Sequence, residues 1–341
     1  MKTDVIAFFN NKGGVGKTSL VYQLAWMYAD MGIRVVAADL DPQANLTTAF
    51  IGDDRLEKLW PENSHPDTIF GCIQPLLKGT GDISTPHLEA IEDALILLVG
   101  DLDLSAFEDE LSAQWPGCMD GKERSFRVLS SFWRVLQSAA REHRASIILM
   151  DLGPNLGSIN RAALIAADYV VIPLSPDLYS LQGLRNLGPT LRRWNHEWEE
   201  RLQKKPVVDD LSLPAGRMEA IGYVIMQHSV RLDRPVKAYE RWIDRIPGTY
   251  RKSVLNQPTG DNISVMEDPN CLILLKHYQS LMPLAQEARK PMFHLKYADG
   301  AIGAHIQAVK QAELDFKKLS DEIARRTNIS LQIESVPIIA Q

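Results

Sequence analysis

The sequence predicts an α/β fold, a doubly wound and mainly parallel sheet flanked by helices. Three observations support this prediction. Short apolar runs alternate with helical segments along the chain, a glycine-rich turn joins the first run to the first helix, and aspartates directly follow two other runs. We expect the 341 residues to form a single domain over 1–327, with an extended region at about 51–125 and a C-terminal tail at 328–341.

The apolar runs are expected to form the strands of the sheet. Turn or acidic residues such as Asp39, Gly100 and Asp151 follow them, as is typical of strand ends. The expected strands are 5–9, 34–38, 94–99, 146–150, 169–173 and 221–226, with a possible last strand at 292–295.

The segments between these runs are expected to be helical. Gly32 stops the first helix, Pro235 suits the first position of another, and 303–326 is amphipathic and should pack on the sheet. The segment 105–124 is expected to be an insertion or an extended loop. The expected helices are 19–31, 70–79, 127–140, 160–167, 178–198, 272–290 and 303–326.

The composition excludes several classes of protein. The net charge is −6, so contact with DNA would need a local basic patch. Three widely spaced cysteines and the lack of a visible signal peptide predict a reduced, cytoplasmic protein without disulfides. No apolar run approaches the roughly 18 residues of a membrane span, so no membrane association is expected.

The turn after the first run, NNKGGVGKT at 10–18, predicts a phosphate-binding loop. Glycines let the backbone aim successive N–H groups inward, and the helix that follows directs its positive end to the same point. Lys17 would reach the β- and γ-phosphates, and the Thr18 hydroxyl would bind Mg²⁺. A glycine turn that binds nothing is disfavoured because motif and context agree. The predicted nucleotide-binding residues here are Lys12, Gly13, Gly14, Val15, Gly16, Lys17, Thr18 and Ser19.

Acidic residues follow the second and the fourth runs. Asp39 and Asp41 alternate after 34–38, so on extended backbone they point the same way, at the edge of the sheet where ligands bind. Four apolar residues before Asp151 make a Walker B pattern, in which the carboxylate holds the metal, usually through a water.

Three segments resemble one family. Asn11 occupies the first glycine position of the loop and a second lysine, Lys12, follows it, so KGGVGKT resembles the deviant Walker A loop of the ParA/MinD group of ATPases. The segment DLDPQAN at 39–45 resembles switch I of this group, and 151–157 resembles switch II, although Leu152 and Gly153 replace the usual Thr and Pro. The chain is most similar to ParA-like partition ATPases.

This resemblance implies a mechanism and residue roles. Lys12 would cross a dimer interface to the partner's nucleotide, Asp39 would join the Mg²⁺ shell, and Asp41 would position or activate the attacking water. Gln227 stands near the family's adenine-reading Asn. ATP, with Mg²⁺, would close two protomers into a homodimer, the dimer would bind nonspecific DNA, and a partner protein would stimulate hydrolysis.

Family members bind DNA through basic residues in the second half of the chain. Here Lys237, Arg241 and Arg245 recur at four-residue steps and would share one helix face, with Arg231 nearby. A solvated face paired with neighbouring acids is an equally good interpretation. If DNA binding holds, the protein would be associated with the nucleoid.

The sequence argues against two other functions and leaves a third open. A metal-cluster carrier with the same loop needs cysteines close after the Walker B segment, and none occurs between Cys118 and Cys271. A membrane-cycling ATPase would end in a basic amphipathic helix, which the tail does not resemble. An ATP-gated interaction module acting on a neighbouring gene product, rather than in DNA partition, stays open.

Overall fold

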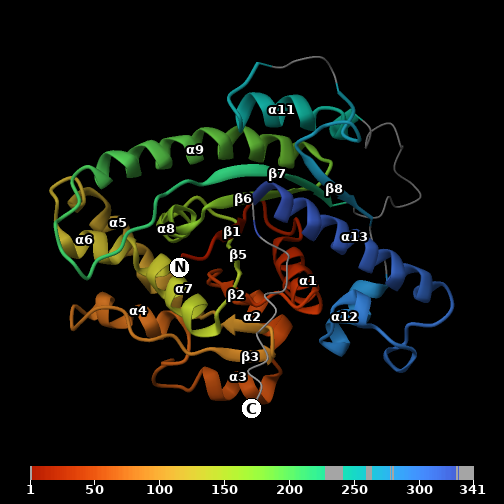
Figure 1. Ribbon diagram of the computed structural model, residues 1–341, viewed down its shortest axis with the longest axis horizontal. Helices are drawn as coiled ribbons and strands as arrows, with labels where there is room; N and C mark the ends of the chain where they lie inside the picture. Colours follow the sequence, from red (N-terminus) through yellow and green to blue (C-terminus); the bar gives the residue numbers. More distant parts are fainter. Residues whose placement is uncertain are drawn as a thin grey trace, which may run out of the picture.

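An eight-stranded sheet with the order β3-β4-β2-β5-β1-β6-β7-β8 forms the centre of the computed structural model (Figure 1). All neighbouring strands are parallel except β3 and β4, which are antiparallel. The structure describes residues 2–226, 241–258, 263–276, 278, 280–327 and 329. The strands are β1 (Val5–Phe8), β2 (Val35–Asp39), β3 (Glu89–Glu92), β4 (Leu95–Leu98), β5 (Ile147–Asp151), β6 (Tyr169–Leu174), β7 (Glu219–Met226) and β8 (Cys271–Leu275).

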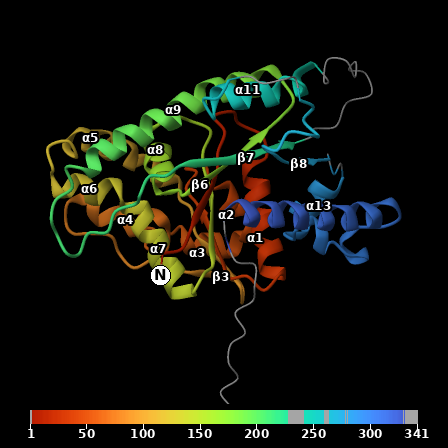
Figure 2. The same ribbon diagram turned by 45° about the horizontal axis from the view of Figure 1, so that its top comes forward.

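Helices cover both faces of this sheet. In Figure 2, α9 and α11 lie side by side along one face, and α1 and α13 lie on the other. The first face carries α4 (Ile69–Lys78), α5 (Phe107–Gly117), α6 (Glu123–Leu129), α7 (Ser131–His143), α8 (Ser158–Ala166), α9 (Leu178–Leu202) and α11 (Ile246–Ser253). The second carries α1 (Lys17–Asp30), α2 (Asn45–Phe50), α3 (Asp53–Leu59), α12 (Leu281–Ala288) and α13 (Ala304–Thr327). Short 3₁₀ turns are η1 (Leu102–Ala106), η2 (Met292–His294) and η3 (Tyr297–Asp299).

The first strand explains why the apolar runs are continuous. Successive side chains of a strand point to opposite faces. Val5 and Ala7 pack in the core beneath α7 to α9, while Ile6 and Phe8 pack against α1, and all four are fully buried. A strand covered by helices on both sides has no solvent-facing position for a polar residue. The predicted fold class is therefore confirmed.

The helix predicted at 272–290 is wrong in its first part, and the strand predicted at 292–295 is wrong. Cys271–Leu275 is β8, which pairs in parallel with β7 at the edge of the sheet, and α12 begins only at Leu281. A short apolar run fits a buried strand as well as a helix, so periodicity alone did not separate them. Met292 starts the turn η2, where its N–H donates to the buried Gln23 Oε1 at 3.0 Å.

The segment 105–124 is not an extended loop. It contains α5, on which Phe107, Leu111 and Trp115 recur every fourth residue and are buried. The helix predicted at 127–140 is interrupted at Ser130, whose hydroxyl donates to the Phe126 carbonyl at 2.6 Å, so α6 ends there and α7 follows. The edge strand β3, which has a glutamate at each end and only two apolar residues between them, was not predicted.

The remaining predicted strands and helices are confirmed, although α9 runs on to Leu202. The helix start predicted at Pro235 and the tail from 330 onward lie outside the described residues.

Candidate nucleotide site

The carboxyl ends of three neighbouring strands bring the predicted site together. In the sheet, β5 lies between β2 and β1. Its last residue, Asp151, is in register with Asp39 of β2 and with Phe8 of β1. The loop after β1 and the two aspartates therefore meet at one edge of the sheet, although more than a hundred residues separate Asp151 from the loop.

The loop adopts a conformation that needs glycine. Gly14 and Gly16 have φ angles of 70° and 88°, in the left-handed region that other residues rarely adopt. A Cβ at Gly16 would lie 2.8 Å from the Met226 Cε. Directly after Gly16, α1 begins, so its free N–H groups face the cavity in front of the loop.

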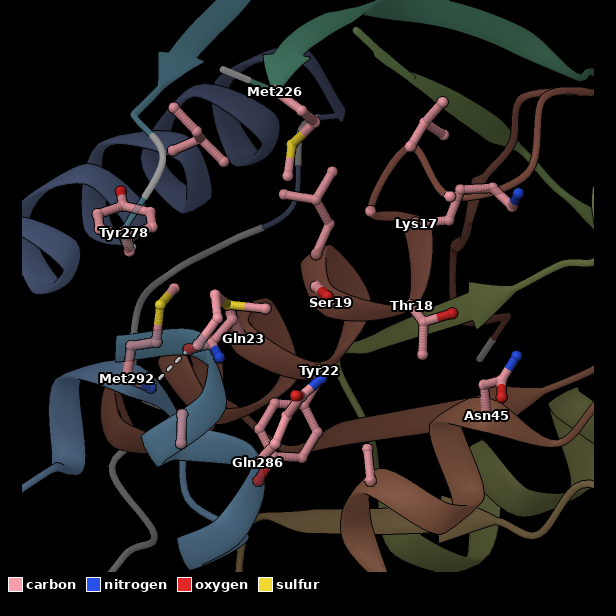
Figure 3. A pocket seen from close by; sticks show the side chains of 18 of the residues that line it. Lys17, Thr18, Ser19, Tyr22, Gln23, Asn45, Met226, Tyr278, Gln286 and Met292 are labelled. Carbon is pink, nitrogen blue, oxygen red and sulfur yellow. Dashed lines mark hydrogen bonds between the residues drawn. The ribbon is translucent and has the colours of Figure 1, made fainter. Parts of the chain in front are cut away.

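Lys17 is held inside this loop. Its Nζ donates to the backbone carbonyls of Asn10 at 3.3 Å and Lys12 at 3.4 Å, and the residue is only 7% exposed. Burial lowers the pKa of the Lys17 ammonium, against the opposing effect of Asp151 and Asp41. Figure 3 shows Lys17, Thr18 and Ser19 together at the start of α1. The ammonium is therefore positioned to meet an anion bound by the loop.

Asp39 and Asp151 form a fully buried acidic pair. The Thr18 hydroxyl donates to Asp151 Oδ2 at 2.7 Å, while Thr47 donates to Asp39 Oδ2 from both its N–H and its hydroxyl at 2.8 Å. Burial raises the pKa of Asp39, and burial together with the charge of Asp39 raises the pKa of Asp151 well above its usual range.

This pair fits a divalent cation. Among the described residues, Asp151 Oδ1 is buried and has no hydrogen-bond partner. Two adjacent carboxylates without a cation repel each other, and carboxylate and hydroxyl oxygens are the ligands that Mg²⁺ prefers. Thr18, Asp39 and Asp151 therefore form a donor set suited to Mg²⁺.

Asp41 lies beside the Walker B segment. It is 6% exposed, and its Oδ1 accepts from the Gln43 N–H at 3.0 Å. A Cβ at Gly153 would lie 3.1 Å from the same Oδ1. Glycine at 153, one of the two departures from the family pattern, therefore leaves the space that the Asp41 carboxylate uses.

The side chain of Lys12 has different partners from that of Lys17. Its Nζ pairs with Asp177 Oδ2, and the two side chains are 26% and 35% exposed. Asp177 also caps α9 by accepting from the Ser180 N–H at 2.8 Å, and the ring of the exposed Tyr179 lies 6.0 Å from the Lys12 Nζ. In the isolated chain the anion beside Lys12 is thus an aspartate of the same chain.

A cavity of about 1030 Å³ opens in front of the loop. Gly13 to Ser19 and Asp41 line one end of it. Leu275, Tyr278 and Met292 line the part of the cavity farther from the loop, as Figure 3 shows for Tyr278 and Met292, while Met226 lies against Gly16. Apolar and thioether side chains suit a planar ring. Sequence reasoning missed Leu275 and Tyr278 because this segment was predicted to be a helix.

Three predicted site residues, Gln227, Arg231 and Lys237, lie outside the described residues. Arg241 and Arg245 are described and exposed. Their guanidinium carbons lie 5.2 and 5.6 Å from the centre of the same indole ring, that of Trp242. These two arginines therefore present their charges on one local surface.

A glycine loop between the first strand and the first helix, with two acidic strand ends beside it, defines the P-loop nucleoside triphosphatase class. Comparison with known proteins narrows this class. Residues 3–204 match the sequence profile of the family described as AAA domain. The chromosome partitioning protein ParA of Caulobacter vibrioides is 30% identical over 204 residues, which cover 60% of this chain and 68% of that protein.

Solved structures show the same fold. A crystal structure of a protein from Corynebacterium diphtheriae has a TM-score of 0.67 at 22% identity and covers 94% of this chain and 98% of its own. McdA from Cyanothece in complex with ATP has a TM-score of 0.58 at 14% identity, covering 94% and 96%. The chain belongs to the AAA domain family of P-loop proteins, among its ParA-type members. In the described part of the chain, no helix has the length and apolar character to cross a membrane.

Proposed function

We propose that the protein is a Mg²⁺-dependent ATPase that dimerises on binding ATP and partitions or positions DNA or another cargo. The observation that carries the proposal is the hydrogen bond from Thr18 at the glycine loop to Asp151, beside Asp39. The ParA name of a relative supports the cargo class. A partner protein that stimulates hydrolysis is part of the same proposal.

The residues of the loop would bind the triphosphate. The N–H groups from Gly13 to Ser19 and the Lys17 ammonium supply positive charge at one end of the cavity. Thr18, Asp39 and Asp151 would hold Mg²⁺, which when bound neutralises charge on the transferred phosphoryl group. The hydrogen bonds from Thr47 fix the Asp39 carboxylate in advance, so little reorganisation is needed.

Asp41 would act on the water. Its carboxylate is mostly buried and held by the Gln43 N–H, which leaves Oδ2 as the acceptor for a proton of the nucleophile. The water oxygen would bond to the γ-phosphorus while the bond to the bridging oxygen breaks, releasing ADP and phosphate. Lys12 would contribute to the facing protomer's site.

The proposal also covers the extent of the ATPase domain, the contact with the base, the DNA surface and the location in the cell. Residues 1–327 would act as one ATPase domain, with Gln227 near the base and the basic residues Arg231, Lys237, Arg241 and Arg245 on the DNA surface. The protein would work in the cytoplasm, at the nucleoid where DNA is bound.

Phosphate release tests the proposal. We expect turnover of ATP that stops when EDTA removes Mg²⁺. Asp41→Ala should bind ATP but release phosphate at no more than about one hundredth of the parent rate. Asp54→Ala, which removes an exposed aspartate of α3, is the matched control and should keep the parent rate. An Asp41→Ala variant that hydrolyses ATP at the parent rate would show that Asp41 has no role in the reaction. Retained hydrolysis without DNA binding would favour the alternative of an ATP-gated interaction module.

A further inference from the structure

A glutamate of α5 holds the start of the helix that follows the Walker B segment. Glu108 reaches the first turn of α8, where Oε1 accepts from the Ser158 N–H and Oε2 accepts from the Ile159 N–H at 2.9 Å. These N–H groups have no acceptor within their own helix, and negative charge is favourable at a helix N-terminus. A Cβ at Gly157 would lie 2.6 Å from Glu108 Oε1, so glycine permits this approach.

A second contact joins the same two helices. The Arg161 guanidinium of α8 lies 4.1 Å from the centre of the Trp115 ring of α5. Trp115 in turn stacks on Trp198 of α9, with ring centres 6.2 Å apart and planes at 16°. The helix α8 is therefore fixed to α5 at its first turn and again one turn later, while α5 is fixed to α9.

The segment 152–157 spans the gap between β5 and this fixed helix. It begins after Asp151 and includes Gly153, which lies against Asp41. The Asn160 amide of α8 donates to the carbonyls of Gly153 at 2.9 Å and Asn155 at 2.7 Å. A shift of the start of α8 would thus move the backbone that lies against Asp41.

We propose that Glu108 is a positioning residue for ATP hydrolysis, acting through the start of α8 on the segment 152–157. This inference rests on the proposed ATPase function. Glu108 does not line the cavity in front of the loop, so its loss should affect turnover and leave nucleotide affinity in place.

The experiment compares Glu108→Ala and Glu108→Gln with Asp109→Ala, which removes an exposed carboxylate from the same turn of α5. For Glu108→Ala we expect kcat to fall about tenfold and the Kd for ATP to stay within about twofold. Glu108→Gln keeps one oxygen acceptor and should recover part of the rate. Asp109→Ala should match the parent.

Hydrogen exchange at the Ser158 and Ile159 amides gives a readout independent of activity. These amides should exchange about tenfold faster in Glu108→Ala than in Asp109→Ala. Unchanged exchange, an unchanged kcat, or an equal loss of kcat and ATP affinity would overturn the inference. A parent protein that hydrolyses no ATP would instead overturn the proposed function, while the exchange measurement would still decide whether Glu108 holds α8.

Discussion

Replacing Lys12 by alanine should leave the fold almost unchanged and remove the dimer. In the structure the only ion pair described for Lys12 is with Asp177, and both side chains are partly exposed. Partly exposed pairs contribute about 0.2–1 kcal/mol. We therefore expect the free energy of unfolding to fall by less than about 1 kcal/mol and the melting temperature by at most about 4 °C.

The Lys12→Ala substitution should affect dimerisation much more than it affects stability. Lys17 remains in its own loop, so the monomer should bind ATP nearly as well as the parent does. The dimer should be lost, because Lys12 is the cation proposed to meet the facing protomer's phosphates. Sedimentation with a slowly hydrolysed ATP analogue would measure dimerisation. Lys58→Ala, on the exposed side of α3, is the control.

Mixing variants sharpens this test. In a dimer of one Lys12→Ala protomer and one Asp41→Ala protomer, the site on the first keeps its own Asp41 and receives Lys12 from the second. One complete site per mixed dimer should restore part of the hydrolysis that each variant lacks alone. A Lys12→Ala protein that dimerises and hydrolyses ATP like the parent would refute the role of Lys12 across the interface.

Two further variants test the phosphate loop and the basic surface. Lys17→Ala should weaken binding of fluorescent ATP by about 10- to 100-fold, because it removes a charged donor from the phosphate site. Unchanged affinity would show that the loop does not bind the phosphates. The triple alanine variant of Lys237, Arg241 and Arg245 should lose affinity for nonspecific DNA in the presence of ATP, and the slope of log K against log salt should fall by about 3. Equal affinity and slope would mean that this face is only solvated.

The glycine loop and the start of α1 could be predicted from the sequence because the residues that determine them are close together in the chain. Gly14, Gly16, Lys17 and Thr18 lie within one turn and helix start, where residue type dictates backbone conformation. The positions of Asp39 and Asp151 follow from a general property of parallel sheets, whose carboxyl ends meet at one edge.

The features that the sequence did not predict depend on contacts between distant segments. Lys12 meets Asp177 across 165 positions and Glu108 meets Ile159 across 51, and neither pairing leaves a pattern in either segment. Cys271–Leu275 forms a strand because it pairs with the free edge of β7. The apolar run alone does not show that such an edge is available. Local patterns identified the loop, while the fold determined which side chains support it.

In the proposed cycle, ATP closes two copies of this chain and hydrolysis lets them separate. The most direct test is sedimentation velocity of the Asp41→Ala variant with Mg²⁺ and either ATP or ADP. Because Thr18, Asp39 and Asp151 remain while the residue proposed to position the water is gone, the variant should stay dimeric with ATP and monomeric with ADP. The same sedimentation coefficient with both nucleotides would contradict the account.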